Sequence, residues 1–193
     1  MGITGRNILT VNAGSSSIKL DLFYVDSAAV IPERSLRLSI AGIGQATSTL
    51  TVQKGAHEPL VHTLAVADYP AAIQVLTHTL DTLKITETIS AVGHRIVHGG
   101  ATYSESVPIT DELITHLEEY SLFDPEHTPG TLSLIQALQQ RIPEVPHVAC
   151  FDTAYFHDLP RVAQLLPLPY KYQAEGLRRY GFHGLSYSYL DTA

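Results

Sequence analysis

The stretch that decides the fold reads Asn7-Ile8-Leu9-Thr10-Val11-Asn12-Ala13-Gly14-Ser15-Ser16-Ser17-Ile18-Lys19-Leu20-Asp21-Leu22-Phe23. Residues 7–11 are rich in aliphatic and β-branched side chains, residues 12–16 are all turn formers, and residues 17–23 alternate polar with apolar side chains. The stretch therefore predicts a strand, a tight loop and a second strand.

Three further β-rich or alternating runs follow at residues 33–40, 48–53 and 60–65, and Gly-containing segments separate them. No helix signal precedes Asp68. Successive strands joined by short turns are typical of antiparallel sheets. We therefore expect the first third of the chain to form an antiparallel meander.

After Asp68 the pattern becomes helical, because apolar residues between Ala71 and Leu83 recur at helical spacing. Thr110 is placed to cap a second helix, since its oxygen and the acidic residues after it satisfy free N–H groups. The other expected elements are a strand over 89–92, a helix over 131–141 ended by Pro143, and a strand over 147–151. A meander that leads into βα units predicts an α/β fold, with a mixed sheet covered by helices.

The composition of the 193 residues is 45% hydrophobic and 16% charged, which supplies a core and excludes disordered and collagen-like classes. The formal net charge of -7 argues against nucleic acid or an anionic membrane as a partner. The single cysteine, Cys150, cannot form an intramolecular disulfide, and the sequence shows no signal segment or long apolar run. We therefore expect a soluble, cytoplasmic protein.

The last ten residues, 184–193, read as the start of a helix. No capping glycine, basic last turn or polar tail follows them. We therefore expect the chain to stop within a helix.

Residues 12–19 combine a glycine, three serines, an amide and Lys19 in one turn. Small residues let backbone N–H groups approach a phosphate, and Lys adds positive charge. The Walker loop needs a second glycine before its lysine and a helix after it, whereas a strand is expected here. A phosphate loop and an ordinary serine-rich hairpin turn both remain open on these residues alone.

Arg95 lies between His94 and His98, ahead of the pair Gly99-Gly100, and the pattern places it just after the buried strand 89–92. A loop at a strand end is a common ligand site, and Arg grips a carboxylate or phosphate with two parallel hydrogen bonds. In an extended chain the two histidines would be about 13 Å apart, too far to hold one metal ion. A structural role is therefore expected for the histidines, and both a functional and a structural role remain open for Arg95.

Asp152 follows the apolar strand 147–151, where a carboxylate can hold Mg²⁺, orient another group, act as a base or simply form an Asx turn. Residues 178–184 place two arginines, two aromatic residues and His183 ahead of the last expected helix. The tyrosines near basic residues do not indicate nucleic-acid binding, because the chain is acidic and lacks an RNA-binding motif.

Taken in order, the segments 11–19, 93–100, 151–154 and 179–184 resemble the acetate kinase family. The resemblance runs across almost the whole chain. It implies the ribonuclease H-like (actin-like ATPase) fold of the acetate and sugar kinase, Hsp70 and actin superfamily. It further implies that residues 1–152 form a first domain and that residues 153–193 are the truncated start of a second, similar domain.

The resemblance also implies an enzyme that transfers the γ-phosphoryl group of ATP to a short-chain carboxylate, with acetate as the expected substrate. The implied reaction is reversible and uses Mg²⁺. It assigns catalytic roles to Arg95, Asp152 and His183. Asn12 is assigned to the metal and phosphate region. Phosphate binding falls to Ser15, Ser17 and Lys19, and the substrate pocket to Arg95, Val97, Glu126, His127 and Phe182. Asp152 is expected to orient metal or Arg rather than to abstract a proton, because a carboxylate substrate is already ionised at neutral pH.

Three departures from the family pattern qualify these roles. Glu126 puts an acid beside the acyl pocket, Leu185 and Tyr187 replace a hydroxyl and an imidazole, and the segments expected for adenosine binding lie beyond Ala193. The alternatives are a diverged nucleotide-binding or regulatory relative, a kinase for propionate, butyrate or another carboxylate, and more weakly a sugar kinase. The 193-residue chain alone is expected to be inactive, and the full-length form to be a homodimer.

Overall fold

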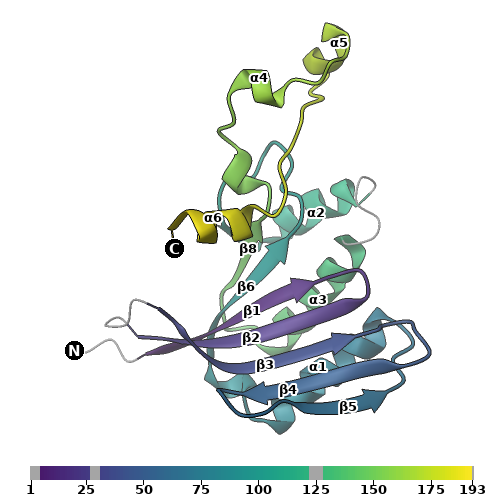
Figure 1. Ribbon diagram of the computed structural model, residues 1–193, viewed down its shortest axis with the longest axis vertical. Helices are drawn as coiled ribbons and strands as arrows, with labels where there is room; N and C mark the ends of the chain where they lie inside the picture. Colours follow the sequence, from purple (N-terminus) through teal and green to yellow (C-terminus); the bar gives the residue numbers. More distant parts are fainter. Residues whose placement is uncertain (1–4, 27–30, 122–127, 193) are drawn as a thin grey trace. The chain divides into compact units, whose positions relative to one another are not determined.

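The computed structural model describes residues 5–26, 31–121 and 128–192 (Figure 1). The chain forms two compact units. The first comprises Met1–Arg95 and Pro108–Ala149, and the second comprises Ile96–Val107 and Cys150–Ala193.

The first unit begins with five strands, each antiparallel to the next (Figure 1). They are β1 (Arg6–Ala13), β2 (Ser17–Val25), β3 (Glu33–Ala41), β4 (Ser48–Lys54) and β5 (Leu60–Leu64). Along β1, β2 and β3 buried side chains alternate with partly exposed ones, so one face of the meander belongs to the core. The expected meander is confirmed.

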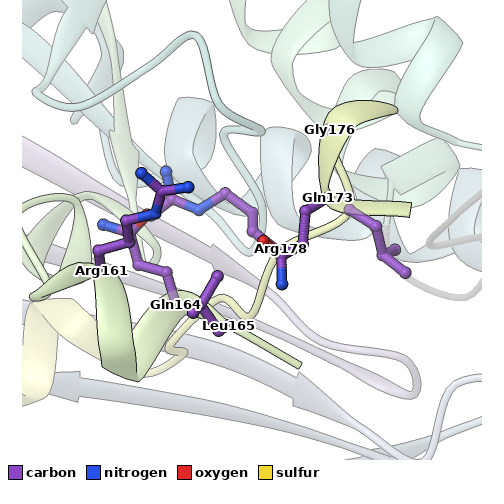
Figure 2. Close-up of a pocket in the computed structure, with 7 residues that line it drawn as sticks. Arg161, Gln164, Leu165, Gln173, Gly176 and Arg178 are labelled. Atoms are coloured by element: carbon purple, nitrogen blue, oxygen red, sulfur yellow. The ribbon is translucent and has the colours of Figure 1, made fainter. Parts of the chain in front are cut away.

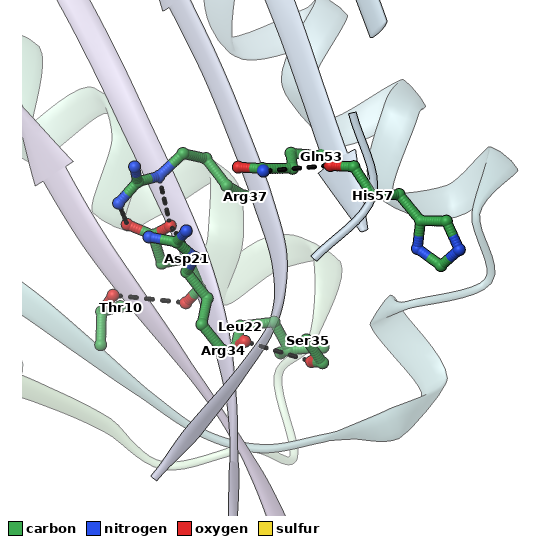
Figure 3. Close-up of polar contacts among 8 residues, drawn as sticks. All are labelled: Thr10, Asp21, Leu22, Arg34, Ser35, Arg37, Gln53 and His57. Carbon is green, nitrogen blue, oxygen red and sulfur yellow. Dashed lines mark hydrogen bonds and ion pairs between the residues drawn. The ribbon is translucent and has the colours of Figure 1, made fainter. Parts of the chain in front are cut away.

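The other face of the meander carries a polar row in which residues of four strands are paired in register (Figure 3). Thr10 lies opposite Asp21, Asp21 opposite Arg37, and Arg37 opposite Gln53. The Arg37 guanidinium donates Nε to Asp21 Oδ1 at 2.8 Å and Nη2 to Oδ2 at 3.4 Å. Opposite charges on directly paired residues favour this register over a slipped one.

Two helices supply the other layer of the core of the first unit. Helix α1 (Tyr69–Thr82) begins after Asp68, whose side chain accepts a hydrogen bond from the Ala71 N–H at 2.9 Å. Helix α3 (Thr128–Arg141) starts earlier than the expected residue 131, because Pro129 is compatible with a first helical turn. Apolar residues of both helices join those of β1, β2 and β3 in one cluster, including Leu76, Leu80, Leu134 and Leu138.

The remaining strands extend the sheet beyond β1. Strand β6 (Ile89–Ile96) is parallel to β1, and the order across the sheet is β5-β4-β3-β2-β1-β6-β8-β7. The outer strands are β8 (His147–Phe151) and the short β7 (Val107–Pro108), and a 3₁₀ turn, η1 (Thr86–Thr88), precedes β6. Helix α2 (Asp111–Tyr120) starts as expected, with Thr110 accepting a hydrogen bond from Leu113 N–H. The predicted mixed sheet flanked by helices is confirmed.

The second unit contains short helical segments and one longer helix: η2 (Ala154–Phe156), α4 (Arg161–Gln164), α5 (Tyr170–Ala174) and α6 (Gly184–Thr192). The helix expected to begin at residue 184 is therefore present. None of the helices in the described ranges is both long enough and apolar enough to span a lipid bilayer.

Candidate functional site

The turn between β1 and β2 forms a tight loop at one end of the meander. Gly14 donates its N–H to the Ser17 carbonyl at 2.7 Å, which closes the loop around Ser15 and Ser16. Ser15 and Ser16 are exposed, Ser17 is half-buried, and Lys19 is exposed at the start of β2. The strand–loop–strand prediction is confirmed, and the loop offers hydroxyl groups and one ammonium group to solvent.

Tyr69 holds this loop from the side of helix α1. Its hydroxyl donates a 2.6 Å hydrogen bond to the Gly14 carbonyl. Burial raises the pKa of Tyr69 to about 12, so the phenol stays protonated and remains a donor at neutral pH. Sequence reasoning missed this residue, because its position at a helix start gave no indication of a partner 55 residues away.

Arg95 lies inside β6, next to the end of β1. The parallel register pairs Val11 with His94, which brings Arg95 beside Asn12, and Arg95 Nη1 donates to Asn12 Oδ1 at 2.9 Å. The placement of Arg95 in a loop after a strand ending at Val92 was therefore wrong. Val92, His94 and Ile96 are all buried, so the alternation of the strand continues through the His94-Arg95 pair and directs Arg95 to the other face.

His94 and His147 form a buried pair on neighbouring strands, β6 and β8. His94 Nε2 lies 2.9 Å from His147 Nδ1, and the rings stack with centroids 5.2 Å apart. Burial, and then the neighbouring imidazole, lower the pKa of His94 from 6.5 to about 3. Burial also lowers the pKa of His147, against an opposing interaction with the Ile142 backbone. His94 thus has a structural role, and sequence reasoning missed its partner.

Asp152 directly follows β8, belongs to the second unit and is 1% exposed. Its N–H donates to the Ile96 carbonyl at 2.9 Å, and its carbonyl accepts the Gly184 N–H at 3.0 Å. A Cβ atom at Gly184 would clash with the Asp152 carbonyl oxygen, so the close approach requires glycine. The start of α6 is therefore anchored directly to the residue that follows the last core strand.

His183 precedes α6 in a left-handed conformation with φ of 61°. Its carbonyl accepts the N–H groups of Ser186 and Tyr187, the first hydrogen bonds of the helix. A non-glycine residue held at positive φ costs about 1 kcal/mol or more, and such residues concentrate at functional sites. The side chains of His183 and its neighbour Phe182 are exposed. The strain thus makes His183 a candidate functional residue on geometry alone.

His98 organises an aromatic group in the same unit. Its Nδ1 accepts the Gly100 N–H at 2.8 Å, and its ring contacts those of Tyr180 and Phe182. Val97, which follows β6, is half-buried. Phe182 is thus positioned by a ring contact that a linear motif does not reveal.

The predicted site residues divide between the two units. Asn12, Ser15, Ser17, Lys19 and Arg95 lie in the first, around the end of β1. The second contains Val97, Asp152, Phe182 and His183. Glu126 and His127 lie outside the described residues.

The magnesium ion expected from the resemblance was assigned to Asn12. The Oδ1 atom of Asn12 already accepts a hydrogen bond from Arg95, and no three His, Cys, Asp or Glu side chains gather into a metal cluster in the described part of the chain. Mg²⁺ in phosphoryl-transfer sites needs only one or two protein ligands beside phosphate and water oxygens. An amide oxygen next to the loop between β1 and β2 fits a metal that nucleotide phosphates would mainly hold.

Solved structures of acetate and propionate kinases resemble the chain. The acetate kinase of Porphyromonas gingivalis superposes with a TM-score of 0.80 at 32% identity, covering 94% of this chain and 46% of that one. A propionate kinase from Francisella tularensis subsp. tularensis SCHU S4 gives a TM-score of 0.82 at 30% identity, covering 96% and 47%. The expected actin-like ATPase fold is therefore confirmed.

The Acetokinase family profile matches residues 7–193, and the chain belongs to this family. The acetate kinase of Oceanobacillus iheyensis is 38% identical over 188 residues, which are 95% of this chain and 46% of that protein. That of Geobacillus kaustophilus is 37% identical over 187 residues, with the same coverage. The family resemblance of the four motifs is confirmed, and the chain spans about half the length of the curated relatives it matches.

Proposed function

We propose that the complete protein transfers the γ-phosphoryl group of ATP to a short-chain carboxylate, reversibly, giving an acyl phosphate and ADP. The observation that carries this proposal is the bond from Arg95 Nη1 to Asn12 Oδ1 beside the Gly14–Ser17 loop. It places a guanidinium next to a loop of exposed hydroxyl groups in a member of the Acetokinase family. Acetate is the first substrate candidate, since the relatives named above include acetate kinases.

The first unit supplies binding and orientation. A guanidinium has five N–H donors in a fixed plane, and the bond to Asn12 fixes the orientation of that plane. Arg95 is thereby suited to grip a carboxylate or the migrating phosphoryl group, while Ser15, Ser17 and Lys19 bind nucleotide phosphates. Phosphoryl transfer relies on alignment and charge stabilisation, and these donors provide both.

The second unit supplies the remaining polar groups. We propose that His183 donates a hydrogen bond to the transferring phosphoryl group and that Asp152 orients a cationic partner. No general base is needed, because a carboxylate substrate with a pKa of about 4 to 5 is already ionised at neutral pH. Bound Mg²⁺ would neutralise charge on the nucleotide phosphates. Val97 and Phe182, with Glu126 and His127, are proposed to line the acyl pocket.

A diverged binding or regulatory relative is the second candidate. The Tyr187 ring packs against Tyr155 and Phe156 at centroid distances of 6.3 and 5.6 Å. Tyr187 therefore contributes aromatic packing at a position where the family resemblance predicts an imidazole. Propionate, butyrate and other carboxylates remain alternative acceptors for an active enzyme.

The organisation of the whole protein is proposed on the same basis. Residues 1–152 form the first actin-like domain, and residues 153–193 begin a second. The complete form acts as a cytoplasmic homodimer, and the 193-residue chain by itself has no kinase turnover.

The test is hydroxamate trapping of acyl phosphate made by the complete protein from Mg-ATP and acetate, propionate or butyrate. Arg95→Ala should lower kcat/KM at least about 100-fold, as expected for loss of a transition-state donor. Arg37→Ala, which removes an arginine from the outer polar row of the meander, is the matched control and should retain turnover. Absence of acyl phosphate with all three acids would refute the kinase, and full turnover of Arg95→Ala would refute the role of Arg95.

A further inference from the structure

The second unit contains a pocket formed within residues 161–178 (Figure 2). Its volume is about 350 Å³, and it is lined by Arg161, Gln164, Leu165, Gln173, Gly176, Leu177 and Arg178. This volume lies at the lower end of the range for small-molecule sites, so the pocket is suited to one small ligand.

The pocket has a positive character that the rest of the chain lacks. Residues 161–180 contain four of the 12 basic residues of the protein but only one of its 19 acidic residues. In the part of the chain that the structure describes, no carboxylate forms an ion pair with Arg161 or Arg178. Two uncompensated cations at one pocket in an acidic protein favour an anionic ligand.

Arg178 provides an independent indication. Its Nε atom is buried and has no hydrogen-bond partner among the described residues. Figure 2 shows its side chain extending across the pocket towards Arg161. The Tyr180 ring lies under the guanidinium, 5.2 Å from its carbon atom, and holds its plane. A buried N–H without an acceptor is costly, and an oxyanion in the pocket would satisfy it.

The backbone around the pocket is fixed by its own hydrogen bonds. Arg179 donates its N–H to the Gln164 carbonyl at 2.8 Å, which ties the segment containing Arg178 to helix α4. Leu177 donates to the Tyr172 carbonyl at 2.9 Å, which ties the same segment to helix α5. Arg161 and Arg178 are therefore held on a connected frame before any ligand arrives, which reduces the entropic cost of binding.

We propose that this pocket binds a small organic anion that carries a phosphate or two carboxylates. Each guanidinium can donate two parallel hydrogen bonds to an oxyanion. Leu165 and Leu177 offer apolar contact to the carbon body of the ligand, and the Gln173 side chain offers an amide. The pocket shares no residue with the loop between β1 and β2, so the proposal does not rest on the kinase activity.

The experiment is an NMR titration of the ¹⁵N-labelled 193-residue chain at constant ionic strength, following the Nε–H signals of the arginines. Glycerol 3-phosphate and succinate represent the two ligand types, and acetate and chloride are comparison anions. At least one of the two ligands should produce saturable shifts of Arg161 and Arg178, with acetate and chloride much weaker. The stronger ligand identifies which chemistry the pocket prefers.

Variants separate this site from other anion sites. Arg178→Gln and Arg161→Gln should each weaken binding about ten-fold or more, as expected for loss of a charge-assisted pair. Arg179→Gln removes the same charge from an exposed neighbour that does not line the pocket, and should bind normally. Lys19→Ala should also bind normally, since it alters only the loop of the first unit.

The proposal is overturned by shifts that do not saturate with either ligand, by equal responses to chloride, or by equal weakening in Arg179→Gln. If Arg178→Gln fails to fold, as judged by amide signal dispersion, the exposed Arg161 supplies the decisive variant. Normal binding by a folded Arg161→Gln would then refute the two-arginine site. Loss of binding in Lys19→Ala would assign the response to the phosphate loop and would also overturn the proposal.

Discussion

Acidification should destabilise the first unit through the buried pair of His94 and His147. One ring nitrogen of the pair must donate and the other accept, so at least one imidazole must be neutral. Protonation of both rings would bring two N–H donors head-on, 2.9 Å apart, away from solvent. The folded state therefore resists protonation, and the unfolded chain does not.

The size of the effect follows from the pKa of His94, about 3 in the folded state against the ordinary value of 6.5. A histidine with a lowered folded pKa stabilises the fold above pH 6.5, and this stability is lost as the pH falls towards 3. At pH 5 proton uptake favours the unfolded chain about 30-fold, which is about 2 kcal/mol. The lowered pKa of His147 adds to the loss in the same direction.

The assay is urea unfolding followed by circular dichroism at pH 7.5 and pH 5. Because other groups also titrate, the wild type is compared with the double variant His94→Leu/His147→Leu, which removes both rings without leaving a buried polar atom unpaired. Between pH 7.5 and pH 5, the free energy of unfolding of the double variant should fall by about 2 kcal/mol less than that of the wild type, or by a still smaller amount. His78→Asn, at an exposed histidine of α1, is the control and should behave as wild type. Equal pH dependence in the double variant and the wild type would refute the buried neutral pair.

Two further substitutions test contacts near the proposed site. Tyr69→Phe removes the donor to the Gly14 carbonyl and should lower the free energy of unfolding by about 1 to 2 kcal/mol, measured by urea titration; an unchanged value would show that this bond does not hold the loop. Gly184→Ala should release α6, because the new Cβ atom would clash with the Asp152 carbonyl oxygen. Faster amide exchange of residues 184–192 would show this release, and Ser186→Ala, on the exposed side of the same helix, should exchange as wild type.

The sequence predicted the meander and the first helices well, because their signals are local. Alternation of polar and apolar side chains can be recognised from neighbouring residues alone, and the predicted cap at Thr110 acts within one helical turn. The end of β6 was misplaced for a related reason. His94 reads as polar, yet it fills a buried position because His147 satisfies one of its nitrogens from another strand.

Contacts between distant segments could not be predicted in this way. Tyr69 and Gly14 are 55 residues apart, and His94 and His147 are 53 apart. In both cases the partner is chosen by the packing of elements that no local pattern specifies. The family resemblance named Asn12 and Arg95 separately, whereas the parallel register of β1 and β6 explains why they meet.

The positions of the candidate site residues in the second unit depend on backbone contacts as much as on side-chain contacts. The backbone carbonyl of Asp152 accepts a hydrogen bond from the Gly184 N–H. His183 lies between Gly184 and Phe182, whose ring contacts His98, and its backbone is held at positive φ. A substitution at Gly184 would therefore move His183 without touching its imidazole. The structural requirement at position 184 is a close approach of two backbone segments, which leaves no room for a Cβ atom and therefore favours glycine.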